Sequence, residues 1–215
     1  MLVLVIDTST PAVTAGVVDV ASGVVLAARA TVDARAHAEV LTPSIAAALA
    51  EAGIDRRDLT AVVAGAGPGP FTGLRVGLVT AAALADALRI PAYPVCSLDA
   101  IAAAAGPGRT LVASDARRRE VYWASYAGGR RRSDPDVSRP GDLAGRLPEL
   151  GCTAMAGAGA ALYADVLGLP VVAPAYPPVG ALAGLATARV LERAPPEALT
   201  PIYLRRPDAA PQAMR

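Results

Sequence analysis

Two stretches of the chain carry residue types that could hold a nucleotide. Asp7 follows the apolar run LVLVI and is followed by Thr-Ser-Thr, and the glycine loop (residues 65–70, GAGPGP) lies between a short apolar run and a long apolar segment. A carboxylate can hold a nucleotide's metal, and the backbone N–H groups near Gly67 and Gly69 could bind phosphate ahead of a helix. The two prolines of the loop have no N–H to offer. Asp7, Gly67 and Gly69 therefore form either a degenerate nucleotide loop or a plain strand-to-helix turn.

The side chains that usually hold a metal are scarce. His37 is the single histidine, and the residue four positions later, where a second ligand would lie on the same helix face, is Leu41. Cys96 and Cys152 lie far apart, without the spacing of a metal site. We therefore predict no metal centre, a capping or interface role for His37, and two reduced thiols.

Several catalytic groups are absent from the sequence. All 20 basic residues are arginine, so a P-loop lysine and a Schiff-base lysine are excluded. A paired-histidine zinc site cannot be built from one histidine, and any Ser-His-Asp triad would have to use His37. The composition therefore favours a protein that does not itself carry out chemistry, and no cofactor is predicted.

Arginines cluster in two places, and both could contact the phosphate backbone of an RNA. Arg117 and Arg118 belong to the stretch SDARRRE, whereas Arg130, Arg131 and Arg132 are consecutive and lie in a stretch rich in proline and aspartate. The net charge of +1 is low for a dedicated nucleic-acid-binding protein. RNA contact and a solvated, locally paired cluster both remain open for these arginines.

The first residues, MLVLVIDTST, have no basic region and predict a strand, not a signal peptide. The apolar fraction of 53% comes mainly from alanine and valine, and the longest apolar segment is shorter than the roughly 20 residues that span a bilayer. We therefore expect a cytoplasmic protein without a membrane partner.

Hydrophobic periodicity and turn residues define the expected elements. Gly53 stands where a C-capping glycine belongs, Ser97 is a plausible N-cap, 128–140 reads as an exposed loop and 207–215 as a frayed tail. The expected strands are 2–7, 12–20, 24–32, 61–64, 92–95, 110–115, 120–127 and 202–204, and the expected helices are 36–52, 71–88, 98–105 and 180–193.

The order of these elements predicts a duplicated α/β fold. The strand at 110–115 ends in aspartate as the first strand does, and AMAGAG at 154–159 echoes VAGAG at 63–67. Strand-strand-strand-helix-strand-helix followed by a weaker copy is the layout of the actin/sugar-kinase/heat-shock-ATPase superfamily. We therefore expect two ribonuclease-H-like halves, mixed sheets flanked by helices, over residues 1–105 and 106–215, with the boundary at Gly106.

The predicted helix 71–88 is apolar almost all round. A helix with one buried face shows an apolar stripe and a polar back, but here only Arg75, Thr80 and Asp86 interrupt the apolar residues after Gly73 and Leu74. Small residues recur every four positions and would let another backbone approach closely. The helix is therefore expected to bury two faces, one on its own sheet and the other in a deep core or on another subunit.

Four stretches together resemble the TsaB (YeaZ) family over essentially the whole chain: IDTST (6–10), GPGPFTGLRVG (67–77), SDARRREVYWASY (114–126) and PIYLRR (201–206). The chain departs from the family at Pro70, where the family usually has serine. The resemblance implies a non-catalytic subunit that dimerises with TsaD in the machinery that makes tRNA N6-threonylcarbamoyladenosine beside the anticodon.

The resemblance also implies partners and a binding face. The partners are TsaD, the ATPase subunit TsaE in a larger complex, tRNA indirectly, and a second copy of the chain when TsaD is absent. The catalytic relative carries the metal-binding histidine pair, of which His37 with Leu41 looks like a relic. The partner face comes from the two long N-terminal helices, for which we expect His37, Leu41, Ile45, Gly73, Leu74, Val76, Gly77, Thr80, Ala81 and Leu84.

Two alternatives belong to other functional classes. An independent metallopeptidase, as an older glycoprotease label for such relatives suggests, would need about three protein ligands for its metal. An actin-like ATPase or sugar kinase would use Asp7 and the glycine loop. Metal analysis of the pure protein separates the first alternative from the scaffold, and calorimetry with ATP and magnesium separates the second.

Overall fold

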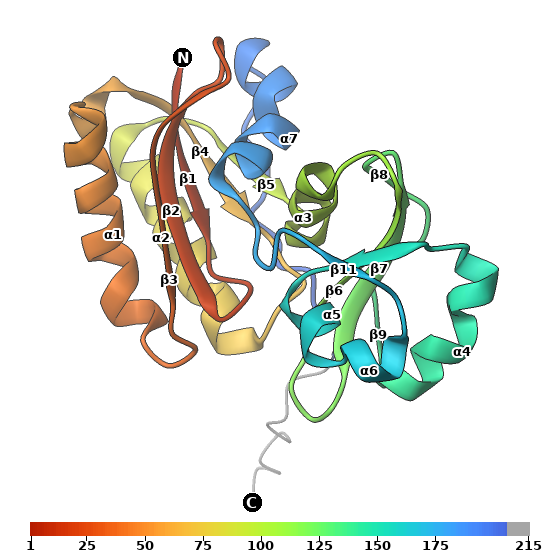
Figure 1. The fold of residues 1–215 in the computed structure, drawn as a ribbon. Helices are drawn as coiled ribbons and strands as arrows, with labels where there is room; N and C mark the ends of the chain where they lie inside the picture. The colour runs from red at the N-terminus through yellow and green to blue at the C-terminus, as the bar shows by residue number, and fades with distance from the viewer. Residues whose placement is uncertain (206–215) are drawn as a thin grey trace, which may run out of the picture.

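The computed structural model describes residues 1–205, so Arg206 and the whole predicted tail at 207–215 lie outside the described residues. Two mixed sheets lie side by side, and helices cover their faces (Figure 1). The fold is the α/β class that the sequence predicts, with two sheet-centred halves.

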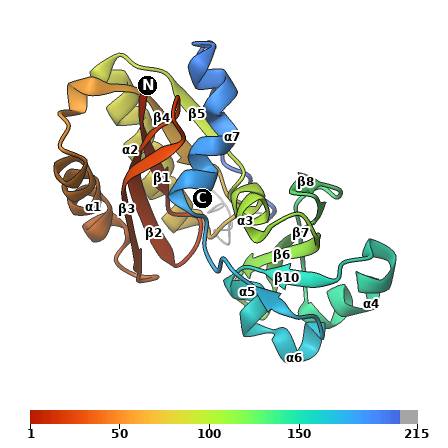
Figure 2. The same ribbon diagram turned by 45° about the horizontal axis from the view of Figure 1, so that its top comes forward.

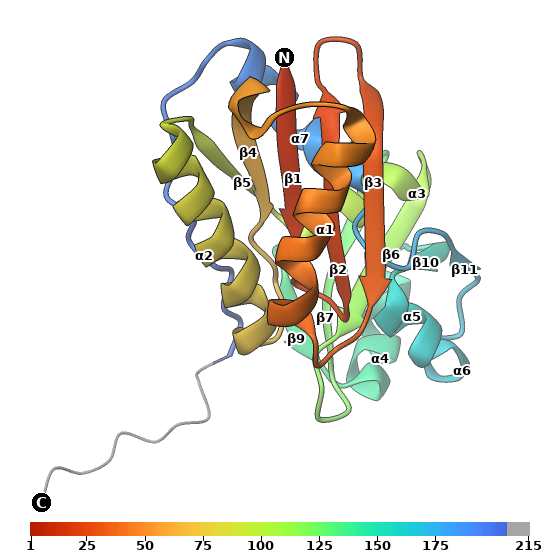
Figure 3. The same cartoon turned by 90° about the vertical axis from the view of Figure 1, so that its left-hand side faces the viewer.

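Sheet A contains the first five strands. Its order is β3-β2-β1-β4-β5, with β1, β2 and β3 antiparallel and β4 and β5 parallel to β1. Helices α1 and α2 lie next to each other on one face (Figure 3), and α7 covers the other. The bounds are β1 Leu2–Asp7, β2 Ala12–Asp19, β3 Val24–Val32, α1 His37–Ala52, a 3-10 turn Arg56–Asp58, β4 Leu59–Gly65, α2 Phe71–Leu88, β5 Ala92–Val95 and α7 Val179–Leu191.

The continuous apolar run of β1 is explained by burial on both faces of the sheet, because successive side chains point to opposite sides. Val3 and Val5 pack in one core with residues of α7 such as Leu182. Leu4 and Ile6 pack in a second core with residues of α1 and α2.

Sheet B has the order β11-β10-β6-β7-β8, and β9 pairs with the first residues of β7. Trp123 and Met155 lie in its core under α4, α5 and α6, while α3 covers the opposite face. The bounds are α3 Ser97–Ala105, β6 Arg109–Asp115, β7 Val121–Ala127, β8 Arg130–Arg131, β9 Asp136–Ser138, α4 Pro140–Leu150, β10 Ala154–Ala156, α5 Ala158–Leu162, α6 Ala164–Leu167 and β11 Val171–Val172.

The two sheets repeat one topology. In sheet A, β1 pairs antiparallel with the next strand and parallel with the strand after the first long helix; in sheet B, β6 pairs antiparallel with β7 and parallel with β10. The glycine turns after β4 and β10 hold equivalent places. This repeat supports the duplication that the two sequence echoes indicate.

The halves exchange their last helices. Helix α3 follows β5 of sheet A, yet it lies beside sheet B (Figure 2). Its residues Leu98 and Ile101 pack with Val112 and Tyr126 of that sheet. Helix α7 follows β11 of sheet B, yet it packs on sheet A. The expected boundary at Gly106 separates the strands of the two sheets but not their packing.

Three expectations need correction. The segment 128–140 contains β8, β9 and the first residue of α4, because its backbone pairs with β7. The sequence pattern does not predict helix α4, because its two glycines and two prolines hide its periodicity. Residues 202–204 are not a strand. The Ile202 N–H donates to the Ala66 carbonyl at 2.8 Å, but no further strand pairing follows in the described part of the chain.

Candidate functional site

The turn after β1 and the glycine loop after β4 meet at one end of sheet A. Asp7 is 1% exposed, and its Oδ1 accepts hydrogen bonds from the Ser9 N–H (2.9 Å) and the Ser9 hydroxyl (2.7 Å). Its Oδ2 accepts a hydrogen bond from the Ser97 hydroxyl at 2.5 Å. Ser97 Oγ in turn accepts from the Gly67 N–H at 3.2 Å. Asp7 is thus tied to the glycine loop through a serine of α3.

The glycines of the loop make room for this turn. A Cβ at Gly65 would lie 1.7 Å from Asp7 Oδ2, and a Cβ at Gly69 would lie 2.2 Å from the Ser9 carbonyl oxygen. Gly67 has φ 93°, a conformation that favours glycine. The three residues predicted for the nucleotide loop are therefore brought together, and the chain's own turn packs against them.

Burial raises the pKa of the Asp7 carboxyl above its ordinary value, and hydrogen bonds from Ser97 and Ser9 oppose this only in part. Ser97 was expected to cap α3. Instead Cys96 is the N-cap residue, without a side-chain capping bond, and the Ser97 hydroxyl is directed to Asp7. Local sequence favours a capping serine, but the buried carboxylate offers a stronger acceptor.

The small residues of α2 are used inside the chain. The Thr8 hydroxyl donates to the Gly73 carbonyl at 2.7 Å and accepts from the Gly77 N–H at 2.9 Å. A Cβ at Gly77 would lie 2.3 Å from Thr8 Oγ1, and one at Gly73 would lie 3.4 Å from His37 Nε2. The edge expected to admit a partner's backbone admits the turn after β1 instead.

His37 at the start of α1 joins the same cluster. Its Nε2 lies 2.8 Å from the Thr10 carbonyl oxygen, which can only accept, so Nε2 carries the proton. A protonated Nε2 has no lone pair to offer a metal ion. Leu41 is 1% exposed in the core of sheet A, and within residues 1–205 no group of three or more His, Cys, Asp or Glu side chains could hold a metal.

Half of the residues expected on the partner face are core residues. Leu41, Ile45, Leu74, Gly77 and Ala81 are buried against sheet A, whereas His37, Gly73, Val76, Thr80 and Leu84 are half-buried along the helices. By length and composition α2 could cross a membrane, but its inner stripe packs on sheet A. We define this inner stripe as Leu74, Gly77, Leu78, Ala81 and Ala85, and the exposed outer stripe as Thr72, Arg75, Val79, Ala82, Ala83 and Asp86.

An aromatic and arginine cluster, not anticipated from the sequence, joins α2 to the end of the described chain. Tyr203 stacks on Phe71 with ring centroids 5.0 Å apart, Arg75 lies over Phe71 at 3.6 Å, and Arg75 Nε donates to the Tyr203 hydroxyl at 2.9 Å. Arg205 pairs with Glu120 and donates to the Ala116 carbonyl at 2.7 Å. The stretches around 71, 120 and 203 that carry the family resemblance are therefore neighbours in space.

The arginines proposed for RNA contact do not form one patch. Arg117 and Arg118 are exposed in the turn before β7, whereas Arg130, Arg131 and Arg132 lie after it. The seven residues of β7 separate the two groups by about 20 Å. Arg131 pairs with Asp99 of α3, whose Oδ1 also accepts from the Tyr126 hydroxyl at 2.8 Å.

The two thiols and a separate groove do not belong to the predicted site. Burial raises the pKa of Cys96 to about 12 and also raises the pKa of Cys152, so both thiols stay protonated near neutral pH. A groove of about 960 Å³ lies between the C-terminal ends of α2 and α7 and contains none of the predicted site residues.

Comparison with known proteins identifies relatives of this chain. A family model described as tRNA N6-adenosine threonylcarbamoyltransferase (TsaD) matches residues 26–196. An uncharacterized protein of Mycobacterium tuberculosis is 53% identical over 213 residues, which cover 99% of this chain and 95% of that protein.

The Escherichia coli tRNA threonylcarbamoyladenosine biosynthesis protein TsaB is 38% identical over 96 residues, 43% of this chain and 42% of that protein. The structure of YeaZ from Pseudomonas aeruginosa superposes with a TM-score of 0.79 at 30% identity, covering 94% of this chain and 99% of that chain. The full-length agreement in fold and the shared motifs lead to one conclusion: the chain belongs to the TsaB (YeaZ) family.

Proposed function

We propose that the chain is the non-catalytic subunit that binds and activates a TsaD-type transferase in the biosynthesis of tRNA N6-threonylcarbamoyladenosine. Family membership supports a role in this modification. The observation that carries the proposal further is the outer stripe of α2: an exposed helix surface on which alanine and valine replace the usual charges.

The outer stripe has the chemistry of a docking surface. Val79 is 65% exposed, its neighbours Ala82 and Ala83 are exposed and small, and only Arg75 and Asp86 carry charge. Helix α1 lies beside α2 on the same face of sheet A (Figure 3). Two such helices could bury the roughly 800 Å² per partner that specific complexes need.

The non-catalytic part of the proposal depends on how the chain uses its polar groups. The Gly67 N–H and the Asp7 carboxylate are engaged with Ser97, and Ser9 packs against Gly69. The Nε2 of His37 is a donor to Thr10. We therefore propose that metal, nucleotide and the threonylcarbamoyl group are handled by the partner, which acts on tRNA in the cytoplasm.

The wider assembly belongs to the same proposal. TsaE would join the complex of this chain with TsaD, and two copies of the chain would associate through the α1/α2 face when TsaD is absent. Both partners would compete for the outer stripe, so TsaD should dissociate a homodimer. The half-buried Val76, Thr80 and Leu84 would line the edge of the same interface.

Titration of the chain with purified TsaD from the same organism tests the proposal. Calorimetry and size-exclusion chromatography should give a stoichiometric complex at micromolar concentration, and the complex should show transferase activity that TsaD alone lacks. Absence of both complex and activation would reject it.

A matched pair of variants then locates the interface. Val79→Glu places a charge on the outer stripe and should weaken TsaD binding at least tenfold. Leu162→Glu places the same charge at a comparably exposed apolar position, 61% against 65%, on α5 of the other half and should leave binding unchanged. Equal affinities of the two variants would move the interface away from α2.

A further inference from the structure

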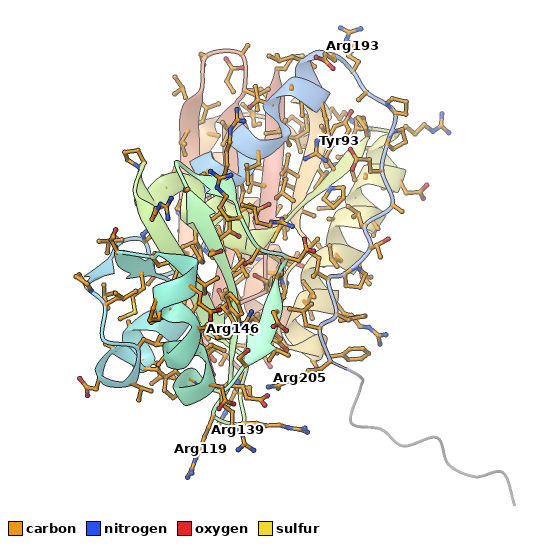
Figure 4. All side chains as sticks on the ribbon, turned by 90° about the vertical axis from the view of Figure 1, so that its right-hand side faces the viewer. Tyr93, Arg119, Arg139, Arg146, Arg193 and Arg205 are labelled. Carbon is orange, nitrogen blue, oxygen red and sulfur yellow. The ribbon has the colours of Figure 1, made fainter. Side chains whose placement is uncertain are left out.

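The turn between β6 and β7 presents three consecutive arginines to solvent. Arg117, Arg118 and Arg119 are all exposed. Arg139 is close to this turn because its neighbour Ser138 pairs with Val121, the first residue of β7. Figure 4 shows Arg119, Arg139 and Arg205 at the same end of the molecule. We call Arg117, Arg118, Arg119 and Arg139 the arginine turn.

The backbone of this turn is held in an uncommon conformation. Arg117, Arg118 and Arg119 have φ of 60°, 56° and 60°, in the left-handed region that costs a residue with a side chain roughly 1–2 kcal/mol. Two backbone hydrogen bonds close the turn, Ala116 N–H to the Glu120 carbonyl and Glu120 N–H to the Arg117 carbonyl, each 3.0 Å. Such strain persists where the surroundings fix it, and it is often found at functional sites.

The nearby acidic groups bind the backbone of the turn or an arginine outside it. Asp115 Oδ1 accepts from the Arg117 N–H at 2.9 Å, and the Glu120 carboxylate pairs with Arg205. Arg117 approaches Asp115 only to 3.8 Å, with 54% of its side chain exposed. Within residues 1–205, Arg119 and Arg139 form no ion pair. These two arginines therefore hold their guanidinium groups in solvent without a carboxylate partner in the described part of the chain.

The other arginine group differs in this respect. Arg131 is engaged with Asp99 through both carboxylate oxygens, which ties β8 to α3. Arg130 and Arg132 are exposed beside it, at the opposite end of β7. This second group has the same residue type in similar number, so it provides a matched control.

The surroundings favour a large, extended polyanion over a small anion. Arg117 lines a cavity of about 290 Å³ together with Thr72 at the start of α2 and His37 at the start of α1. The positive ends of two helices thus continue the basic surface of the turn. Arg119 and Arg139 lie outside this cavity, so the basic surface extends beyond what one small ligand could cover.

We propose that the arginine turn contacts the phosphate backbone of RNA, which for this chain is the tRNA bound by its complex. The inference rests on the proposed function, because the complex brings tRNA to this subunit. Guanidinium groups bind phosphate through paired, charge-assisted hydrogen bonds. Such contacts position an RNA without reading its sequence, so the expected contribution is to affinity and salt dependence.

Binding of an unmodified tRNA transcript to the assembled complex with TsaD tests this contact. The double variant Arg119→Ala/Arg139→Ala should bind about tenfold more weakly at 0.1 M salt, and the slope of log K against log salt should become shallower by about 1–2. Arg119→Lys/Arg139→Lys should recover most of the affinity, because the charges return. The control Arg130→Ala/Arg132→Ala should change affinity less than twofold.

Assembly with TsaD, measured first for every variant, separates the two proposals. Failure of the unmodified chain to assemble rejects the proposed function, and tRNA binding by the chain alone then tests the turn. Equal assembly with unchanged affinity and slope overturns the RNA contact. So does an equal loss in both alanine variants, which would reflect net charge only. Binding to anionic lipid vesicles that requires Arg119 and Arg139, with tRNA affinity unchanged, would overturn it in favour of a membrane.

Discussion

The two faces of α2 are built from similar residues but have opposite surroundings. The inner stripe, with Gly77 and Ala81, is packed so closely that the Thr8 hydroxyl sits where a Cβ would be. The outer stripe also contains small apolar residues, such as Val79 and Ala83, beside its two charged residues, yet these apolar residues are exposed. Small residues on the inner face are therefore explained by the chain's own fold. Those on the outer face have no such explanation, and docking of a partner supplies one.

This comparison changes which substitutions are informative about partners. A bulky residue at Gly77 would test the fold, because Gly77 contacts Thr8. A charged residue at Val79 or Ala83 would test association, because nothing in residues 1–205 covers those side chains enough to bury them. The following predictions test this difference, from the largest expected effect to the smallest.

Gly77→Ala should destabilise the fold by about 2 kcal/mol, since the added Cβ displaces Thr8 Oγ1 from two buried hydrogen bonds. Thermal unfolding should show a decrease in Tm of roughly 4–8 °C. In the Thr8→Ala background the additional cost of Gly77→Ala should be smaller.

Gly184→Ala in α7 is the matched control, because no atom lies within 4 Å of a Cβ at that position. It should stabilise the protein by up to about 1 kcal/mol through helix propensity. If both alanine variants changed Tm equally, the close packing between α2 and the turn after β1 would be disproved.

Ala83→Glu should leave the free energy of unfolding within about 0.5 kcal/mol of the unmodified value, because the residue is exposed on the outer stripe. Affinity for TsaD should fall about tenfold, or about 1.4 kcal/mol. Denaturant unfolding and calorimetric titration measure the two quantities. A loss of stability larger than the loss of affinity would contradict the division between the faces.

Tyr203→Ala should cost about 1 kcal/mol, because it removes the stacking on Phe71 and the hydrogen bond from Arg75. Tyr203→Phe keeps the stacking and should cost less than half as much. The measurement is urea unfolding. Equal costs would show that the hydrogen bond, not the ring contact, holds the end of the described chain to α2.

Asp7→Asn should alter the pH dependence of stability. Burial raises the pKa of Asp7, so the resulting penalty on folding is absent below the ordinary value of 3.8, grows as the pH rises towards the native-state pKa, and is complete above it. The stability of the asparagine variant relative to the unmodified chain should therefore increase as pH rises from 3 to 7.

Asp19 provides the control of opposite sign. Hydrogen bonds from the N-terminal ammonium and Ser22 lower its pKa, so its contribution is present above pH 3.8 and is lost on acidification. Asp19→Asn should lose relative stability as pH rises. A parallel response of the two variants in thermal melts at several pH values would disprove the assigned cause at Asp7.

The sequence predicted elements well where one pattern dominates. The apolar run before Asp7, the period of α1 with Gly53 at its end, and the helix 71–88 all match the structure, with Gly53 at φ 67° as a C-cap requires. Each of these depends on local propensity and burial periodicity, which are legible along the chain. The sequence pattern does not predict helix α4 or strands β8 and β9, because prolines, glycines and charges interrupt it. Pairing with β7 stabilises the two strands, and packing in the core of sheet B stabilises the helix.

The candidate site was only partly predictable. The sequence pattern associates Asp7 with the glycine loop, but it predicts a helix-capping role for Ser97, the serine that joins them. The roles of Arg205 and Tyr203 could not be seen, because their partners lie more than 80 positions away along the chain. No local signal encodes such contacts.

The sequence by itself determined the class of fold, the family, and the absence of lysine and of a histidine pair. Only the tertiary structure decided which side of α2 is free and which arginines are neutralised. The reason is that hydrophobic periodicity records how apolar a surface is but not what covers it. Whether Gly77 meets Thr8 or a partner, and whether an arginine meets an aspartate or solvent, depends on segments brought together by folding.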